Sequence, residues 1–247
     1  MDEDRISVIR ERYLHICDQI AEATIRSGRA SGTVHLVTVT KSQPVEVVRE
    51  AIAAGATLLG ENYTEEAVSK INVIKENGLE WHMIGHVQSR KAELVVRYFD
   101  MLHSLDSIRL AGRLDKFCAE VGRTLPALVE VNVSGEESKF GLPAWDERHW
   151  PELEPVLEQI LAFSHLGVCG LMTMPPFFDD PEQTRPFFRR MRRLQGYLIK
   201  HFPQGKWTEL SMGTSADYIA AVEEGATIVR VGRSILGQRP VERLSEH

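Results

Sequence analysis

The chain has 247 residues, of which 43% are hydrophobic and 26% are charged. This balance is typical of a globular protein with a buried core, and it excludes fibrous and disordered classes. The 29 basic and 35 acidic residues give a net charge of -6, so nucleic acid is not an expected partner.

The first residues, MDEDRISVIRERYL, begin with acidic side chains and lack the apolar core of a signal peptide. No later run reaches the ~20 apolar residues that a membrane span needs. We therefore expect a cytoplasmic protein without membrane-spanning segments. The cysteines show neither pairing nor metal-ligand spacing and are predicted to be buried small hydrophobes: Cys17, Cys118 and Cys169.

A leading helix is predicted from apolar residues that recur at spacings of three and four between Ile6 and Ile20, and it should end near Gly28. Beyond it, short apolar runs alternate with longer helical patterns. The predicted strands are 34–40, 57–60, 80–85, 100–105, 126–133, 166–173, 207–210 and 227–231. The helical segments between them include 44–54, 62–76, 107–121, 151–163, 181–202 and 215–224.

This alternation around eight strands favours a (β/α)8 TIM-like barrel with an additional N-terminal helix. An open doubly wound sheet fits the same pattern, because the pattern does not show whether the sheet closes. No repeat, linker or low-complexity tract marks a domain boundary. We therefore predict a single domain over residues 1–247.

Chemistry in such barrels takes place at the carboxyl ends of the strands. Lys41 directly follows the apolar strand VHLVTVT and is expected to point into the barrel mouth. At the edge of an apolar interior a lysine is easily neutralised, and a neutral amine can attack an aldehyde. Lys139 also follows a strand, but its polar turn, GEESKFG, indicates a solvated charge.

Two loops predict a phosphate site. The segment SMGTSAD at 211–217 offers a glycine, hydroxyls and the start of a helix, and VGRS at 231–234 adds a second glycine and more N–H donors. Loops after strands seven and eight bind phosphate in many barrels. The alternative is that the hydroxyls only cap the helix and the glycines only turn the chain. A reactive lysine beside a phosphate site indicates pyridoxal 5′-phosphate (PLP).

Arg230 lies inside the last predicted strand, where a long cation must point inward to a partner. A pyridoxal ring nitrogen is one such partner. Because arginine keeps its proton, the ring would stay neutral and would be a poorer electron sink than with an aspartate partner. A salt bridge to Glu130 or Glu209 is the alternative.

Two further patterns are assigned structural roles. His82 and His86 lie four residues apart, but on a strand this spacing separates the rings too far for a zinc ion, so no metal is predicted. We expect His82 to point inward and His86 to lie in a loop. The basic run at 185–193 carries an apolar stripe, which predicts a helix with its arginines on the solvated face.

Several motifs, in order along most of the chain, carry a family resemblance. They are VTVTKSQP (37–44), GENYTEE (60–66), WHMIGHVQSRK (81–91), VNVSGEESKFG (131–141), GLMTMPP (170–176), ELSMGTSADYIAAVEEGATIVRVG (209–232) and RSILGQR (233–239). With them the sequence resembles the pyridoxal-phosphate homeostasis proteins of the YggS/PROSC type, which are similar to the barrel domain of alanine racemase.

The resemblance implies a role for each matching residue. Lys41 would form the Schiff base with PLP, Arg230 would face the pyridine nitrogen, and Asn62 would lie near the cofactor. The implied phosphate cradle is Ser215, Gly232 and Arg233, and the implied pocket lining adds Met212 and Gly213. The family is expected to bind and buffer PLP, with effects on amino-acid and keto-acid balance, without robust catalysis. PLP-dependent apoenzymes are candidate partners.

Three positions depart from the expected motifs. Ser42 follows the lysine in place of a threonine, and Thr214 stands where a second methionine is commoner. Arg233 replaces a small residue and adds a charge beside the implied phosphate, which should alter affinity.

A PLP-dependent amino-acid racemase of low activity is the chief alternative. Alanine racemase has a further β domain whose tyrosine is the second acid or base, and this sequence ends soon after Arg233, so we expect that domain to be absent. Inversion needs proton transfer at both faces of a carbon, and Lys41 alone offers one. A sugar-phosphate isomerase would share the phosphate loops but need no Schiff base. The absence of an extended apolar patch favours a monomer.

Overall fold

The computed structural model describes residues 2–238. Its strands are β1 (His35–Val39), β2 (Leu58–Glu61), β3 (Glu80–Met83), β4 (Met101–Leu105), β5 (Leu125–Asn132), β6 (Leu142–Pro143), β7 (Leu166–Met172), β8 (Glu209–Thr214) and β9 (Ile228–Val231). Its α-helices are α1 (Glu3–Arg26), α2 (Val45–Ala53), α3 (Thr64–Val73), α4 (Ala92–Tyr98), α5 (Ile108–Val121), α6 (Glu154–Leu161), α7 (Arg185–His201), α8 (Tyr218–Glu223) and α9 (Arg233–Leu236). Short 3-10 helices are η1 (Ser89–Lys91), η2 (Glu147–Leu153) and η3 (Pro181–Thr184).

The sheet closes into a parallel barrel. Its strands follow the order β4-β3-β2-β1-β9-β8-β7-β5, and β4 also pairs with β5, which joins the two edges. The short β6 pairs in parallel with the end of β5 and stands outside this ring. Closure confirms the predicted (β/α)8 barrel and excludes the open sheet.

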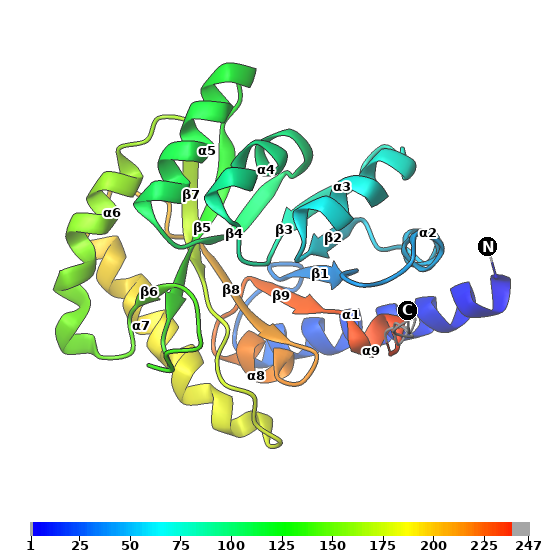
Figure 1. Ribbon diagram of the computed structural model, residues 1–247. Helices are drawn as coiled ribbons and strands as arrows, with labels where there is room; N and C mark the ends of the chain where they lie inside the picture. Colours follow the sequence, from blue (N-terminus) through cyan, green and yellow to red (C-terminus); the bar gives the residue numbers. More distant parts are fainter. Residues whose placement is uncertain (1, 239–247) are drawn as a thin grey trace, which may run out of the picture.

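The helices surround the barrel, and the predicted leading helix is confirmed as α1 (Figure 1). The side chain of Asp2 accepts the N–H of Arg5 and caps its first turn. The buried face of α1 includes Ile9, Ile16 and Ile20, and it packs against α8, α2 and α9. The N-terminal helix therefore covers the outside of the barrel next to the junction of its first and last strands.

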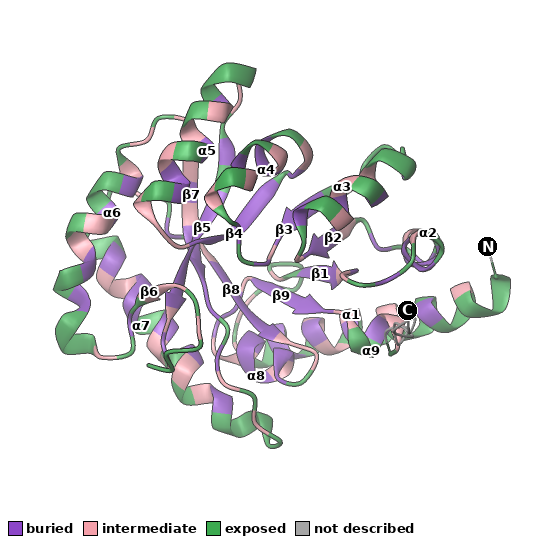
Figure 2. Cartoon of the chain, in the orientation of Figure 1, coloured by how far each residue is buried: buried purple, intermediate pink, exposed green. Residues whose placement is uncertain are grey.

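Two apolar cores form on either side of the barrel wall. The larger core lies between strands and helices, and burial is concentrated on the strands and on the inner faces of the helices (Figure 2). The smaller core fills the barrel interior and consists of Val37, Met101, Leu128, Met172 and Ile228. This apolar floor leaves the polar chemistry to the layers nearer the carboxyl ends of the strands.

The seventh barrel strand differs from its prediction. It was predicted to end at residue 210, but β8 continues to Thr214, so Ser211 to Thr214 lie within the strand. Gly213 has a φ of +93°, beside a register shift between β8 and β9. A Cβ at Gly213 would stand 2.5 Å from that of Ala221, so the glycine lets α8 pack closely on the strand.

Several short elements were not predicted, among them α4 and β6. The helix α4 spans seven residues between β3 and β4, and β6 has only two. A helix of two turns shows too little of a 3.6-residue period to stand out from neighbouring apolar residues. The strand β6 pairs with the end of β5, and the buried face of α4, with Ala92, Val95 and Val96, belongs to the core between strands and helices.

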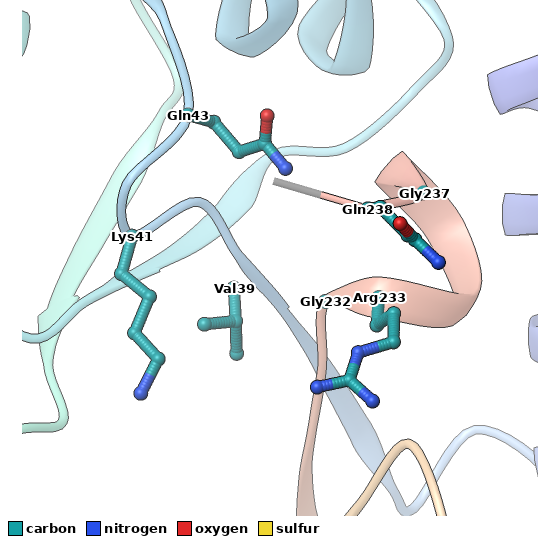
Figure 3. Close-up of a pocket in the computed structure, with 7 residues that line it drawn as sticks. All are labelled: Val39, Lys41, Gln43, Gly232, Arg233, Gly237 and Gln238. Carbon is teal, nitrogen blue, oxygen red and sulfur yellow. The ribbon is translucent and has the colours of Figure 1, made fainter. Parts of the chain in front are cut away.

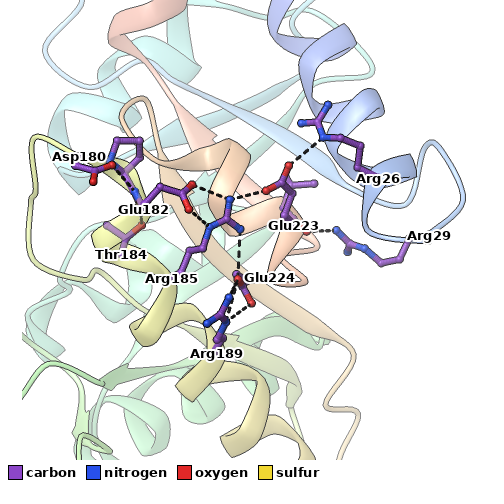
Figure 4. Close-up of polar contacts among 11 residues, drawn as sticks. Arg26, Arg29, Asp180, Glu182, Thr184, Arg185, Arg189, Glu223 and Glu224 are labelled. Atoms are coloured by element: carbon purple, nitrogen blue, oxygen red, sulfur yellow. Dashed lines mark hydrogen bonds and ion pairs between the residues drawn. The ribbon is translucent and has the colours of Figure 1, made fainter.

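The arginine-rich helix α7 is only partly as predicted. Arg189, Arg192 and Arg193 are exposed, but Arg185 is not, with 19% of its side chain accessible. Its guanidinium lies 2.7 Å from Glu182, 2.6 Å from Glu223 and 3.3 Å from Glu224 (Figure 4). The prediction of a solvated face is therefore wrong for Arg185, which ties α7 to the end of α8. It is also wrong for Arg190, which is half-buried and donates to the carbonyl oxygen of Val133 at 2.5 Å.

Three further predictions concern the burial of the cysteines, membrane-spanning helices and the bounds of the domain. Cys118 is buried as predicted, whereas Cys17 and Cys169 are only partly buried, so the prediction is wrong for these two. Across residues 2–238, no helix combines the length and the apolar character that a bilayer crossing requires. The single domain over 1–247 stays a prediction, because residues 239–247 lie outside the described chain.

Gly170 in β7 offers a test of the barrel packing. A Cβ at this position would stand 2.0 Å from the carbonyl oxygen of Glu209 on β8. Gly170→Ala should therefore lower the free energy of unfolding by about 1–3 kcal/mol, because the strands must separate. Gly196→Ala is the control, since its Cβ would meet nothing within 4 Å, and it should raise stability by about 0.5–1 kcal/mol through helix propensity. Chemical denaturation measures both, and wild-type stability in Gly170→Ala would contradict this packing.

Candidate functional site

A cavity of about 710 Å³ opens at the barrel mouth. It lies where the strands end, and its size suits a small organic ligand. A second cavity of about 330 Å³ adjoins it. The residues that line both are Val39, Lys41, Gly232 and Arg233. These four residues, from the first and last strands and the loops after them, mark the centre of the candidate site.

Lys41 lies two residues beyond β1 and reaches the mouth, as predicted. Its side chain and that of Arg233 extend in the same direction on either side of Val39 (Figure 3). The register of the first and last strands, with Thr38 opposite Val231, brings these loops together. A Cβ at Gly232 would stand only 2.8 Å from the carbonyl oxygen of Val39, so this approach requires glycine.

The two predicted phosphate loops meet at Ser215 and Gly232. The backbone N–H of Gly232 donates to the Ser215 hydroxyl at 3.3 Å. A hydroxyl that accepts a hydrogen bond still has its own proton to donate. Thr214 is engaged elsewhere, because Asp217 accepts from its N–H at 2.7 Å and from its hydroxyl at 3.1 Å. Asp217 is the residue before α8, so the alternative that Thr214 or Ser215 caps this helix is wrong.

The remaining predicted residues divide into two groups. Asn62 and Arg233 line the larger cavity together with Lys41. Met212 does not, because its side chain is fully buried in the core between barrel and helices. Gly213 packs against α8 and is likewise not among the residues that line the described cavities. Both belong to β8, and their contacts are with the core and with α8.

Arg230 lies inside the barrel and borders the larger cavity. Its guanidinium donates to the Ser211 hydroxyl, to the carbonyl oxygen of Thr173 at 2.9 Å and to the sulfur of Met174 at 2.8 Å. Burial lowers the pKa of Arg230 to about 10, which still leaves it charged at neutral pH.

The alternative prediction for Arg230, a salt bridge to Glu130 or Glu209, is not confirmed. Arg230 forms no salt bridge within residues 2–238, so the ion pair with Glu130 or Glu209 is wrong. Glu209 begins β8 at the opposite end of the barrel and accepts the hydroxyl of Thr227 at 2.6 Å. Glu130 is nearer, and its negative charge acts on Arg230 without a direct contact.

A chain of hydrogen bonds crosses the barrel from Arg230. Ser211 contacts His103 Nδ1 at 2.9 Å, and His103 Nε2 contacts His82 Nδ1 at 2.9 Å. Burial lowers the pKa of His82 to about 4 and that of His103 well below its ordinary value, so both rings are neutral. Arginine can only donate, so the Ser211 hydroxyl accepts a hydrogen bond from Arg230 and donates its own hydrogen to His103 Nδ1. His103 then carries its hydrogen on Nε2 and donates it to His82 Nδ1.

The other candidate residues are placed as the sequence predicted. His82 points inward, whereas His86 lies in the loop after β3, 2.9 Å from Asp106 and stacked on Phe140. Lys139 stays in its turn, 4.0 Å from Glu136. Within residues 2–238, no three His, Cys, Asp or Glu side chains are grouped to hold a metal ion.

Glu130 is a site residue that the sequence analysis considered only as a partner for Arg230. It lines the larger cavity, is 6% exposed, and its Oε2 has no hydrogen-bond partner among the described residues. Burial, with a smaller contribution from Asp106, raises the pKa of Glu130 to about 7, and Arg230 opposes this shift. Alternation along β5 could have revealed it, because Leu128 fills the barrel and residue 130 must point the same way.

Comparison with known proteins identifies the family. Residues 20–240 match the model of the alanine racemase N-terminal domain. The pyridoxal phosphate homeostasis protein of Aquifex aeolicus is 37% identical over 230 residues, which cover 93% of this chain and 97% of that protein. The protein of the same name from Escherichia coli K12 is 36% identical over 237 residues, with 94% and 97% covered. The chain belongs to the pyridoxal phosphate homeostasis protein family.

Solved structures agree with this family and with the fold. PipY of Synechococcus elongatus, solved with PLP bound, superposes with a TM-score of 0.80 at 33% identity and covers 93% of this chain and 100% of its own. Alanine racemase of Clostridium difficile superposes with a TM-score of 0.68 at 14% identity. That match covers 96% of this chain but 57% of the racemase, and it shows the barrel fold alone.

The raised pKa of Glu130 predicts a dependence of stability on pH. The folded protein holds this proton more tightly than the unfolded chain, so the contribution to stability is present below the ordinary carboxyl pKa and is lost as the pH rises to about 7. The full loss corresponds to about 3 kcal/mol. Glu130→Gln should therefore gain stability relative to wild type as the pH rises from 4.5 to 8, measured by urea denaturation of the cofactor-free protein. Glu137→Gln, at an exposed position, is the control, and parallel curves for wild type and Glu130→Gln would contradict the assignment.

Proposed function

We propose that this chain binds PLP as a Schiff base on Lys41 and buffers the intracellular cofactor without robust catalysis. The observation that carries the proposal is that Lys41, Arg230 and the Ser215–Gly232 pair converge on one cavity. The PLP-bound structure of the relative PipY supports the choice of ligand. The name shared by the relatives supports the role in homeostasis.

The residues of the cavity fit this cofactor. PLP needs an amine for its aldehyde, N–H and hydroxyl donors for its phosphate, and a partner for its ring nitrogen. Lys41 supplies the amine, and Ser215, Gly232 and Arg233 supply donors on one wall of the same mouth. A side chain at position 232 would collide with the backbone of Val39, so glycine lets the loop after the last strand lie against the first strand at this wall. Asn62 adds an amide at the rim of the cavity.

Arg230 favours a carrier over an efficient enzyme. Bound PLP supplies a reactive aldehyde and an electron sink. The guanidinium has five N–H donors, and its bonds to Ser211, Thr173 and Met174 leave donors for a ring nitrogen. Because Arg230 keeps its own proton, it stabilises a neutral ring, and a neutral ring withdraws electrons poorly. Proton abstraction from a bound amino acid would then be slow.

The wider roles are part of the same proposal. The protein would act in the cytoplasm, would exchange PLP with PLP-dependent apoenzymes, and would work as a monomer. The supporting observations are the family to which the chain belongs and the absence, within residues 2–238, of a helix fit to cross a membrane.

Lys41→Ala tests the proposed function directly. Wild-type protein with PLP should show the visible absorption band of a Schiff base, and the band should be absent from Lys41→Ala, since the carbon–nitrogen bond cannot form. Borohydride reduction followed by peptide mapping should place the label on Lys41. Lys139→Ala is the control and should keep both the band and the label.

The opposite outcome would point to another class of ligand. A wild-type protein without the band, or one with label scattered over surface lysines, would refute the Schiff base. The sugar-phosphate isomerase would then become the leading alternative, because it needs the phosphate loops but no aldehyde chemistry.

Amino-acid racemisation is the second candidate function, and Glu130 is the observation in its favour. Its carboxyl lines the same cavity as Lys41, and burial raises its pKa to about 7, which suits a general acid or base. If the protein is a carrier, incubation with single enantiomers of amino acids should give no racemisation above that of free PLP. Racemisation that is lost in Glu130→Gln would instead establish a weak racemase with Glu130 as its second proton-transfer group.

A further inference from the structure

A second lysine lies buried behind the candidate site. Lys70 on α3 is 3% exposed. Its ammonium lies 2.7 Å from Glu61 at the end of β2, 2.6 Å from Glu66 one turn earlier on α3, and 2.8 Å from the carbonyl oxygen of Thr40. These three acceptors match the three N–H donors of an ammonium group. We call Lys70, Glu61 and Glu66 the Lys70 cluster.

The Lys70 cluster holds the backbone on both sides of Lys41. Lys70 binds the carbonyl oxygen of Thr40, the residue before Lys41. Glu66 accepts the backbone N–H of Ser42, the residue after it, at 2.6 Å. Glu61 accepts the hydroxyl of Thr40 at 2.7 Å. The Lys70 cluster, in which Lys70 and Glu61 are buried, therefore holds the two peptide groups that orient the Lys41 side chain.

The backbone conformation of Ser42, in the turn after β1, shows why these contacts are needed. Ser42 has a φ of +58°, and in the described chain it is the single non-glycine residue with a positive φ. This left-handed conformation is costly for a residue with a Cβ and persists only where surrounding contacts impose it. The hydrogen bond from the Ser42 N–H to Glu66 is such a contact.

We propose that Lys70, Glu61 and Glu66 are positioning residues for Lys41. They fix the turn so that the Lys41 amine enters the cavity in the orientation needed to attack an aldehyde carbon. The inference rests on the proposed function, in which Lys41 forms a Schiff base. Misplacing a reacting group by about 1 Å can lower the rate of a reaction by about a hundredfold. The position of the Lys41 amine should therefore have a large effect on the rate of Schiff-base formation.

The same cluster explains the choice between two neighbouring lysines. The Lys70 amine is engaged by Glu61, Glu66 and the carbonyl oxygen of Thr40. Lys70 also does not line either cavity of the mouth within residues 2–238. Lys70 therefore orients the nucleophile and does not compete with it.

The test separates Schiff-base formation from cofactor binding. Pyridoxine 5′-phosphate has the ring and phosphate of PLP but no aldehyde, so its affinity reports the cavity alone. Borohydride trapping of PLP on Lys41, quenched at intervals and mapped by peptide, reports the rate of the covalent step. Both are measured for wild type, Lys70→Met and Lys70→Arg, with Lys116→Met as a control for an exposed lysine paired within its own helix.

Lys70→Met should slow trapping at Lys41 by about tenfold or more while the affinity for pyridoxine 5′-phosphate stays at its wild-type value. Lys70→Arg keeps the charge and should recover part of the rate, and Lys116→Met should match wild type. Trapping at the wild-type rate in Lys70→Met would overturn the inference. A parallel loss of analogue affinity would also overturn it, because the cluster would then support the whole cavity and not Lys41 in particular.

Glu66→Ala keeps the inference testable if Lys70→Met does not fold. Glu66 is 30% exposed, so its removal should be tolerated. It deletes the acceptor of the Ser42 N–H and should also slow trapping at unchanged analogue affinity; a wild-type rate would count against the inference. If wild type itself forms no Schiff base on Lys41, the proposed function fails. If wild type reacts and every variant reacts equally fast, this inference alone fails.

Discussion

Closure of the barrel through β4 and β5 is the constraint on which the site depends. Closure turns the inner faces of β3 and β4 toward those of β8 and β9. Only then can His103 on β4 contact Ser211 on β8 and, through it, Arg230 on β9. The same closure turns Glu130 on β5 toward the cavity that Lys41 enters from β1. In an open sheet these side chains would lie on separate faces or at distant edges.

The barrel interior is layered by polarity. Apolar side chains fill its floor, and the next layer holds Arg230, Ser211, His103, His82 and Glu130. Burying such groups is costly unless each finds a partner. Arg230, Ser211, His103 and His82 are joined by a chain of hydrogen bonds. Each donates to the next, because the guanidinium at the start of the chain can only donate. Glu130 is the exception: its Oε2 has no hydrogen-bond partner among the described residues, although its side chain lines the cavity.

The sequence predicted the barrel and the place of Lys41 at its mouth, because these follow from strand order and from residues directly after strands. For the same reason it placed the loops after β8 and β9 together, and they meet at Ser215 and Gly232. It missed Glu130 and Lys70, whose importance depends on neighbours distant in the chain. It placed Gly213 beside a ligand, whereas the glycine serves the packing of α8, since a local pattern does not reveal which surface approaches a backbone. Arg185 was assigned to solvent because helical periodicity does not show the carboxylates of α8.

The charged groups around the cavity differ in how they can respond to an anionic ligand. Arg230 has a pKa of about 10 and keeps its charge near neutral pH, so it offers a fixed positive field. Burial places the pKa of Glu130 at about 7, so this carboxyl can change its charge. A phosphate-bearing ligand adds negative charge nearby and therefore favours the protonated form of Glu130. By linkage, protonation of Glu130 would favour such a ligand to the same extent, so binding of the ligand would be coupled to proton uptake. The coupling would arise because Glu130 Oε2 has no hydrogen-bond partner within residues 2–238, in a layer where the neighbouring side chains are paired.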